Sequence, residues 1–397
     1  MRVVIVGAGQ AGAAVAARLR ALGHQGEIIL IGDEPAPPYQ RPPLSKAYLL
    51  GEIEEERLWL RAPEFWTENK IDLRFGRPVS AIDPVAKTVT VGSQQIAYDQ
   101  LVLATGSAPR RLPAQCGGDL DGVYMLRTLD DIDRMRPEFA PGRRVVVIGG
   151  GYIGLEAAAV ARKLRLEVTL LEASPRILSR VASPHTSDFI RELHREKGVT
   201  LLEGSGLDRI RREGGSIFVR LSDGREFPAH FVIVGVGVTP CTGFAETAGL
   251  HLDNGIATDE MGRTSDPSIW AAGDCASFPW RGRRIRLESV GNAIDQAEAV
   301  AANLLGAGQP YIARPWFWSD QYDLKLQIAG LSTGYNNVVL REESGTSVWY
   351  YRDKELLAVE AMGDARAYMV GKRLLESGKS ADPNAVRTTS DFKALLE

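Results

Sequence analysis

A strand, a glycine-rich turn and a helix at the start of the chain constrain the fold more than any other stretch. The apolar run 2–6 (RVVIV) leads into the turn 7–12 (GAGQAG), which opens an alanine-rich helical pattern to residue 22. A second apolar run (EIILIG) then ends at Asp33. A G-x-G-x-x-G turn alone is weak evidence, but this order and spacing are typical of a dinucleotide-binding βαβ unit.

Each glycine of this turn has a separate task. Gly7 allows the tight turn, Gly9 lets backbone N–H groups approach a pyrophosphate, and Gly12 lets the helix pack on the strand. Asp33 is placed to accept hydrogen bonds from a ribose. The alternative is a glycine turn in an ordinary α/β domain, and the complete unit disfavours it.

The same unit occurs a second time. The run 144–148 (RVVVI) leads into the turn 149–154 (GGGYIG), a helix to about residue 166, and a strand that ends at Glu172. Two such sites in one chain suggest one resident dinucleotide and one that exchanges. The sequence therefore predicts a flavoprotein supplied by a nicotinamide coenzyme.

Length and composition set the remaining bounds. With 397 residues, 44% of them hydrophobic, the chain suits two or three domains with real cores. A net charge of −3 gives no general attraction to nucleic acid or to an anionic membrane. No apolar run approaches the ~20 residues of a membrane span, and the first strand leaves no room for a signal peptide, so we expect a cytoplasmic protein.

The three cysteines, Cys116, Cys241 and Cys275, are far apart in the sequence and form no C-x-x-C motif. They predict neither a disulfide framework nor a zinc site.

A proline-rich loop follows the first unit at residues 35–46, and Ser45 is a candidate cap for a helix over 46–50. Ligands of doubly wound folds bind just past the carboxyl ends of the strands, where this loop lies. A stiff connector with a solvated Lys and Arg is the equal alternative.

The rest of the chain predicts an α/β fold with two Rossmann-type dinucleotide-binding domains and a C-terminal α+β domain. Asp274 ends a short apolar strand, where it can bind a polyol hydroxyl or simply cap a helix. Residues 324–361 alternate with period two, which indicates an antiparallel sheet, and a helix is expected over 364–376. The predicted domains are a discontinuous dinucleotide-binding domain (1–108 and 246–315), a second dinucleotide-binding domain inserted into it (109–245) and a C-terminal domain (316–397); the family resemblance given next implies that they are the FAD-binding, NAD-binding and interface domains.

With these motifs in place, the chain resembles the FAD-dependent, NADH-using ferredoxin reductases of bacterial oxygenase systems, the family of putidaredoxin reductase and the biphenyl dioxygenase reductases. The resemblance covers nearly the whole length. PPLSKAYL and PWFWSDQY are specific to this group, whereas the glycine turns occur in many flavoproteins. It implies the glutathione reductase fold, in which an NAD domain interrupts the FAD domain and an interface domain follows.

The resemblance also implies the cofactor contacts. The FAD contacts fall on Gly7, Gly9, Ala11, Gly12, Asp33, Arg41, Lys46, Val79, Ala104, Thr105, Gly106, Arg127, Asp274, Val290 and Trp318. The NAD contacts fall on Gly149, Gly151, Ile153, Gly154, Glu156, Glu172 and Gly237.

Three of these residues are the expected catalytic group. The resemblance places Lys46 beside the flavin N5 edge, paired with Glu156, where the two orient the nicotinamide. It places Trp318 near the flavin and the ferredoxin face, although core or interface packing of Trp316 and Trp318 is an equal alternative.

NADH is the expected coenzyme. Glu172 ends the second strand of its unit, where a carboxylate accepts from the ribose 2′-hydroxyl and repels a 2′-phosphate. Arg176 and Arg180 follow closely and weaken this inference.

The expected reaction is hydride transfer from NADH to FAD, followed by two single-electron deliveries to a [2Fe–2S] ferredoxin serving a cytochrome P450 or a Rieske dioxygenase. The basic run 281–286, with Arg281, Arg283 and Arg284, is a candidate docking patch, and a solvated charge cluster is its favoured alternative. Disulfide reduction is set aside because residues 35–60 contain no cysteine. An NADH oxidase and a redox-responsive flavoprotein similar to apoptosis-inducing factor stay open, as does a monomer or a weak homodimer.

Overall fold

The computed structural model describes residues 1–343 and 345–396, and the chain forms two compact units. The first unit consists of Met1–Gln40, Glu55–Ala108 and Thr239–Pro315. The second consists of Arg41–Glu54, Pro109–Val238 and the residues from Trp316 onward. The proposed division into three domains stays a prediction, since the second unit contains both the predicted NAD-binding region and the C-terminal region.

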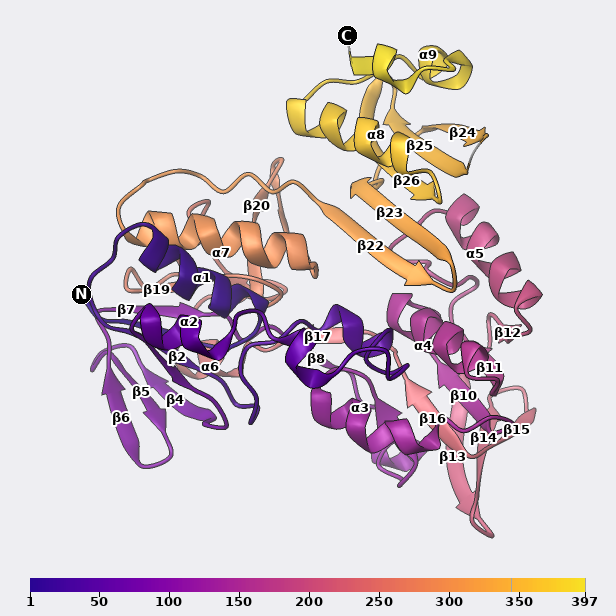
Figure 1. The fold of residues 1–397 in the computed structure, drawn as a ribbon, viewed down its shortest axis with the longest axis horizontal. Helices are drawn as coiled ribbons and strands as arrows, with labels where there is room; N and C mark the ends of the chain where they lie inside the picture. Colours follow the sequence, from indigo (N-terminus) through magenta and orange to yellow (C-terminus); the bar gives the residue numbers. More distant parts are fainter. Residues whose placement is uncertain (344, 397) are drawn as a thin grey trace. The chain divides into compact units, whose positions relative to one another are not determined.

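The first unit is built on a five-stranded parallel sheet in the order β19-β7-β1-β2-β3 (Figure 1). Its strands are β1 (Val3–Val6), β2 (Ile28–Ile31), β3 (Ile71–Arg74), β7 (Gln100–Leu103) and β19 (Ile269–Ala271). Its helices are α1 (Gln10–Ala21), α2 (Pro63–Glu68), α6 (Gly243–Thr247) and α7 (Val290–Leu304). The first predicted strand–helix–strand unit is thus confirmed as β1, α1 and β2.

Small side chains let α1 and α7 pack against one another. Ala13 and Ala16 of α1 share one buried cluster with Ala297 and Val300 of α7 and with the apolar strands. Figure 1 shows the two helices side by side. This packing brings the N-terminus of each helix close to the carboxyl ends of the strands, where a dinucleotide-binding fold holds its ligand.

Smaller sheets complete the first unit. An antiparallel sheet contains β4 (Val79–Asp83), β5 (Thr88–Val91) and β6 (Gln94–Ala97), and another small sheet contains β18 (Ile256–Ala257), β20 (Ala276–Trp280) and β21 (Arg283–Ile285). A 3₁₀ turn spans Glu55–Leu58. The short strands β8 (Ser107–Pro109) and β17 (Val238–Pro240) pair with one another.

The second unit repeats the parallel arrangement in the order β12-β11-β10-β16-β9. Its strands are β9 (Val123–Met125), β10 (Arg144–Ile148), β11 (Glu167–Leu171), β12 (Thr200–Leu202) and β16 (Phe231–Val234), with the added antiparallel sheet β13 (Leu207–Glu213), β14 (Ser216–Leu221) and β15 (Glu226–Ala229). Its helices here are α3 (Leu129–Met135), α4 (Tyr152–Lys163) and α5 (Pro184–Glu196). The second predicted unit is confirmed as β10, α4 and β11.

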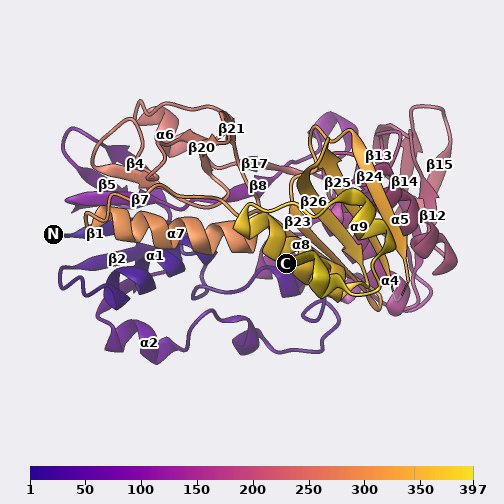
Figure 2. The same ribbon diagram turned by 90° about the horizontal axis from the view of Figure 1, so that it is seen from above.

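The C-terminal region forms the antiparallel sheet that the period-two pattern predicts, in the order β22-β23-β26-β25-β24 (Figure 2). Its elements are β22 (Trp316–Gln321), β23 (Leu324–Gly330), β24 (Asn337–Glu342), β25 (Thr346–Arg352), β26 (Glu355–Met362), α8 (Ala365–Ser377), α9 (Pro383–Thr388) and a 3₁₀ turn (Phe392–Leu396). One face of the sheet packs on α8. The other face packs on Tyr152 of α4 and Phe189 of α5.

The expectation for the proline-rich loop is wrong in one respect. Residues Pro42–Ser45 form a 3₁₀ turn, and turns without a helix follow over 46–50. Ser45 therefore ends a short helix and does not begin one; two successive prolines favour the first positions of a helical turn because their φ angle is already fixed. None of the helices within the described residues is long and apolar enough to cross a membrane.

Candidate functional site

The first glycine turn is shaped for close backbone approach. A Cβ on Gly7 would stand 2.1 Å from the carbonyl oxygen of Ala104, and one on Gly12 would stand 1.9 Å from the carbonyl oxygen of Gly7. Gly7 also has a φ of +108°, which side chains rarely tolerate. At Gly9 the case is opposite, since no heavy atom of the described chain lies within 4 Å of a Cβ there. The turn is closed toward the protein and open on the side where a ligand is expected.

The second turn repeats this geometry. A Cβ on Gly149 would stand 2.3 Å from the carbonyl oxygen of Gly235, and one on Gly154 would stand 2.0 Å from that of Gly149. Gly151 again faces open space, judged by the residues that the structure describes. Gly9 and Gly151 are the N-cap residues of α1 and α4, and neither has a side chain to cap its helix. The N–H groups of both helices can therefore bind an anion.

The acidic residues that follow β2 and β11 differ in register. In the first unit the N–H of Gly7 bonds the carbonyl of Ile31, and in the second the N–H of Gly149 bonds that of Leu171. Gly32 therefore holds the place that Glu172 holds in the second unit, and Asp33 lies one residue further along. Asp33 is exposed, and its carboxylate accepts from the N–H of Glu34 at 3.1 Å.

Asp274 lies beside the carboxyl end of β19, and the chain then enters β20. The helix-cap alternative is therefore wrong, since no helix starts there. Ser107 donates to the Asp274 carboxylate at 2.8 Å. Nearby, Gln296 of α7 accepts from the N–H of Gly273 at 2.9 Å, while its own Nε2 is a buried donor with no acceptor among the described residues. A polar donor left unpaired in this way fits a bound cofactor with oxygen acceptors.

The other predicted FAD residues of the first unit lie after β7, at the start of β4 and in the first turns of α1 and α7. Ala104, Thr105 and Gly106 directly follow β7, and Thr105 donates to the carbonyl of Cys241 at 2.7 Å. Val290 begins α7, where Ser289 caps the helix by accepting from the N–H of Asn292. The remaining two are Ala11 near the start of α1 and Val79, the first residue of β4; both are buried.

Lys46 and Glu156 form a largely buried ion pair in the second unit. Lys46 Nζ lies 2.9 Å from Glu156 Oε2, and the two side chains are 20% and 3% exposed. Ser45 donates to the same oxygen at 2.6 Å, and Ser319 donates to Oε1 at 2.7 Å. The carboxylate thus receives donors on both oxygens, which offsets the cost of burying its charge.

Arg41 and Arg127 also meet within this unit. The guanidinium of Arg41 donates to the backbone carbonyl of Arg127 at 2.7 Å. Arg127 precedes α3, whose N-cap Thr128 forms a reciprocal capping box with Asp131. The capping box fixes the backbone at the carbonyl that Arg41 binds.

Glu172 lies over the second glycine turn. Its Oε2 accepts from the N–H of Gly150 at 2.7 Å, and its Oε1 accepts from the N–H of Ser174 at 2.6 Å. These bonds fix the carboxylate at the end of β11, beside the turn that a dinucleotide approaches.

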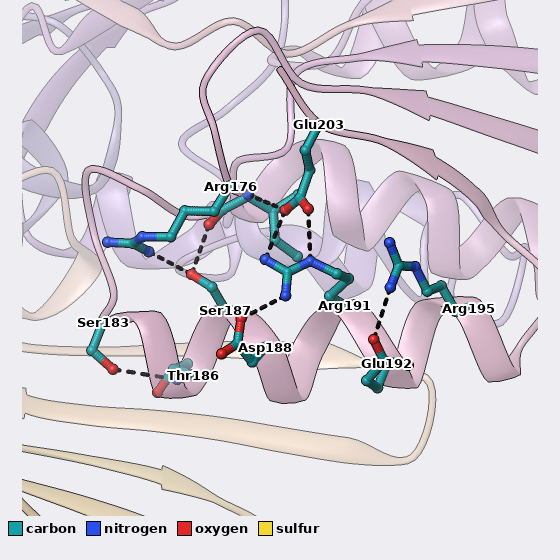
Figure 3. Close-up of polar contacts among 10 residues, drawn as sticks. Arg176, Ser183, Thr186, Ser187, Asp188, Arg191, Glu192, Arg195 and Glu203 are labelled. Carbon is teal, nitrogen blue, oxygen red and sulfur yellow. Dashed lines mark hydrogen bonds and ion pairs between the residues drawn. The ribbon is translucent and has the colours of Figure 1, made fainter. Parts of the chain in front are cut away.

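The loop after Glu172 is braced by α5 (Figure 3). Arg176 donates to Ser187 Oγ and to the carbonyl of Ser179, so its guanidinium is turned toward α5. Glu203 binds Arg191 through two hydrogen bonds of 2.7 and 3.0 Å and accepts from the N–H of Ile177 at 2.8 Å.

Arg180 follows in the same loop. Its Nη2 lies 3.1 Å from the position that a Cβ on Gly237 would take, and Gly237 has a φ of +100°. Arg180 rather than Arg176 thus lies beside a predicted NAD contact. Ile153, also predicted to contact NAD, is 43% exposed in the first turn of α4.

Two tryptophans and two buried polar residues alternate along strand β22. Trp316 and Trp318 stack with ring centroids 5.4 Å apart, and Lys372 Nζ lies 4.8 Å from the Trp316 centroid. Ser319 and Gln321 alternate with the tryptophans and are buried.

The basic run forms the hairpin β20–β21. Arg284 donates to the backbone carbonyls of Thr258 and Ser277, and its guanidinium also lies 3.6 Å from Asp253. Arg281 and Arg283 lie over the ring of Trp280 at 4.9 and 5.3 Å from its centroid. The docking hypothesis therefore narrows to Arg281 and Arg283, because Arg284 supports the loop itself.

Comparison with known proteins assigns the chain to a family. Residues 1–297 match the family model described as pyridine nucleotide-disulphide oxidoreductase, and residues 316–396 match the reductase C-terminal model. The chain belongs to the pyridine nucleotide-disulphide oxidoreductases. Members of this family bind FAD and use NAD(P)H.

Curated relatives span the whole chain. Rhodocoxin reductase of Rhodococcus erythropolis is 42% identical over 404 residues, which cover 100% of this chain and 94% of the relative. Putidaredoxin reductase CamA of Pseudomonas putida is also 42% identical, over 96% of this chain and 93% of the relative.

Solved structures agree with these relatives. The reductase in a covalent putidaredoxin reductase–putidaredoxin complex matches with a TM-score of 0.95 and 40% identity, over 100% of this chain and 98% of that one. A ferredoxin reductase from Rhodopseudomonas palustris matches with a TM-score of 0.96 and 41% identity, over 100% of both chains. The predicted glutathione reductase-like fold is confirmed.

The family description includes disulfide chemistry, but the cysteines of this chain do not suit it. None of the three forms a disulfide with another described cysteine, and Cys275 is fully buried. Burial raises the pKa of the Cys275 thiol, which donates to the carbonyls of Leu103 and Ala272. A buried thiol that stays protonated is a poor nucleophile.

Two donors to Glu156 were missed by sequence reasoning. Ser45 stands next to Lys46 in the PPLSK motif, and that adjacency was a usable signal. Nothing local connects Ser319 with Glu156, because 163 positions separate them.

Proposed function

We propose that this protein oxidises NADH and passes the electrons through FAD to a [2Fe–2S] ferredoxin that serves an oxygenase. The relatives named above support this, since they are named as reductases of redox partner proteins and one was solved in complex with putidaredoxin. When bound, FAD accepts a hydride from the reduced nicotinamide and releases the electrons one at a time. The protein residues bind, orient and shield the reacting groups.

The Lys46–Glu156 pair is the observation that carries this proposal. Lys46 comes from the motif specific to these reductases, and Glu156 comes from the first turn and a half of the helix that follows the second glycine turn. Their ion pair joins the segment expected at the flavin to the segment expected at the nicotinamide. Hydride transfer needs no side-chain acid or base, so the role of the pair is orientation.

The coenzyme preference follows from Glu172. A carboxylate held at the second glycine turn accepts a ribose hydroxyl and repels a 2′-phosphate. The guanidinium of Arg176 is turned toward α5 by its bonds to Ser187 and Ser179, whereas Arg180, beside Gly237, is the cation that can partly offset this repulsion. We therefore propose NADH as the coenzyme.

The proposed ferredoxin-binding residues are Trp318 and, in the β20–β21 hairpin, Arg281 and Arg283. Trp318 is assigned to the electron-transfer face, and Arg281 with Arg283 to an acidic ferredoxin surface, because Arg and aromatic side chains are enriched at interfaces. A cytoplasmic location is part of the proposal, and free cysteines suit a reducing compartment.

The first experiment measures NADH oxidation and oxygen uptake before and after a [2Fe–2S] ferredoxin is added. A large increase in electron flux on addition supports the reductase. Fast oxygen uptake whose rate does not change when ferredoxin is added identifies an NADH oxidase instead. Negligible NADH turnover together with NADH-driven dimerisation identifies a signalling flavoprotein.

A second experiment tests the ion pair. Lys46→Met should slow anaerobic flavin reduction by NADH, and Lys46→Met/Glu156→Gln should restore stability without restoring the rate, because no buried charge is left unpaired. Lys163→Ala is the matched control, since it removes the exposed Lys163–Glu52 pair. Flavin reduction by Lys46→Met at the wild-type rate contradicts the assigned role.

A further inference from the structure

A chain of hydrogen bonds between buried side chains leads away from Glu156 through the second unit. Ser319 donates to Glu156 Oε1 at 2.7 Å, and Gln321 Nε2 donates to Ser319 Oγ at 3.2 Å. Gln321 Oε1 lies 2.8 Å from His194 Nε2, and His194 Nδ1 lies 3.1 Å from the Tyr322 hydroxyl. Ser319, Gln321 and His194 are at most 1% exposed. The reaction proposed above leaves the last three of these groups without a role.

The chemistry of the donors gives this chain one direction. The carboxylate of Glu156 can only accept, so Ser319 donates its hydroxyl hydrogen and accepts from Gln321. The free oxygen of Gln321 then requires a hydrogen on His194 Nε2, which leaves Nδ1 to accept from Tyr322. Each bond points toward Glu156, and aligned hydrogen bonds of this kind polarise one another.

Burial keeps each member in the required form. It lowers the pKa of His194 to about 4, so the ring is neutral near pH 7 with the hydrogen on Nε2. It raises the pKa of Tyr322, so the phenol keeps the hydrogen that it donates. The directions of these hydrogen bonds are therefore fixed, because neither His194 nor Tyr322 changes its protonation state near neutral pH.

These hydrogen bonds also hold strand β22 in place. Ser319 and Gln321 are two positions apart and share one face of the strand, whereas Trp316 and Trp318 share the other. Anchoring Ser319 to Glu156 and Gln321 to His194 of α5 therefore sets the position of Trp316 and Trp318 on the opposite face.

We propose that His194 and Gln321 are positioning residues for the Lys46–Glu156 pair. This inference rests on the proposed orienting role of that pair. By holding Ser319 against Oε1, the two residues leave Oε2 to Ser45 and Lys46. Without this hold the carboxylate can rotate, and the ammonium group of Lys46 loses its fixed place.

A proton relay through the same residues does not fit. The side-chain amide of Gln321 could pass a proton only by forming its imidic acid. Neutral His194 has one ring hydrogen, on Nε2, and already donates it to Gln321. The cluster therefore contributes geometry to the reaction and no proton.

The test compares three variants in the FAD-loaded protein. Gln321→Leu keeps the volume and removes two links of the chain. His194→Gln keeps a donor amide where Nε2 of the imidazole lies, so it is the conservative rescue. His185→Gln is the matched control, because His185 is exposed on the same helix, α5.

Two readouts separate positioning from folding. The ¹⁵N NMR signal of His194 should show a neutral ring with hydrogen on Nε2 in the wild type and a changed environment in Gln321→Leu. The rate constant of anaerobic flavin reduction at saturating NADH should fall about tenfold in Gln321→Leu, with little change in the NADH dissociation constant. His194→Gln and His185→Gln should stay near the wild-type rate.

The outcomes distinguish this inference from the proposed function. Both readouts omit ferredoxin, so a missing ferredoxin response leaves them intact. A wild-type rate in Gln321→Leu with a changed His194 signal overturns the inference, as does a doubly protonated ring in the wild type at pH 7. If Gln321→Leu loses FAD or fails to fold, Ser319→Ala removes only one hydroxyl, and a wild-type reduction rate in that variant also overturns it.

Discussion

Replacement of His194 by glutamine should make the protein resist acid better than the wild type. The folded-state pKa of His194, about 4, lies below the value of about 6.5 expected in an unfolded chain. Above pH 6.5 the ring is neutral in both states and contributes no pH dependence. As the pH falls below 6.5, the unfolded chain binds a proton that the folded chain refuses, so stability is lost until the pH reaches about 4.

The size of the effect follows from the same two pKa values. By linkage, this one group costs about 2 kcal/mol of unfolding free energy at pH 5 and about 3 kcal/mol at pH 4. Burial is the main cause of the shift, and the hydrogen bond with Gln321 opposes it. Two charged groups act on this end of the cluster: Lys197 lies over the Tyr322 ring, and Arg162 acts on the Tyr322 phenol.

The assay is urea unfolding followed by tryptophan fluorescence, at several pH values from 7.5 to 5, for the wild type and His194→Gln. The difference between the two proteins should grow by about 2 kcal/mol over this range, because the variant lacks the titrating ring. The contributions of other titrating groups to the unfolding free energy are the same in both proteins and cancel in the difference. One of these groups is Glu360, whose pKa is raised by burial and whose contribution increases as the pH falls. An unchanged difference from pH 7.5 to 5 refutes the buried neutral ring.

Three further predictions concern the coenzyme and the partner. Gly151→Ala should fold and keep FAD, since its Cβ meets no described atom within 4 Å, but should raise the KM for NADH about tenfold. Glu172→Ala should narrow the NADH-to-NADPH ratio of kcat/KM by about tenfold, and an unchanged ratio contradicts the assignment. Arg281→Ser/Arg283→Ser should slow ferredoxin reduction at low salt and flatten its salt dependence, with NADH-driven flavin reduction unaffected as the internal control.

Local patterns predicted the two nucleotide-binding units well because their signals are short-range. Each unit needs an apolar strand, a glycine turn and an alanine-rich helix in immediate succession, and all three are written within about thirty residues. The C-terminal antiparallel sheet was predictable for the same reason, because its period-two alternation is a local pattern.

Predictions failed where a side chain found a partner far along the chain. Ser45 was expected to cap a helix, but it donates to Glu156, 111 positions away. The hydrogen bond from Ser319 to the same carboxylate, across 163 positions, was missed for the same reason. A single sequence carries no signal for such pairings, because the fold decides them and not the neighbouring residues.

The Lys46–Glu156 ion pair and strand β22, which carries Trp318, are connected by a direct hydrogen bond. Ser319 is the direct neighbour of Trp318 on β22, and its hydroxyl donates to the carboxylate of Glu156, which binds Lys46. A substitution at Trp318 that shifts the strand will therefore also disturb Glu156, so slow electron delivery in such a variant does not by itself show that electrons pass through the indole. Measuring flavin reduction by NADH in the same variant separates the two effects, since an undisturbed Glu156 leaves that half-reaction at the wild-type rate.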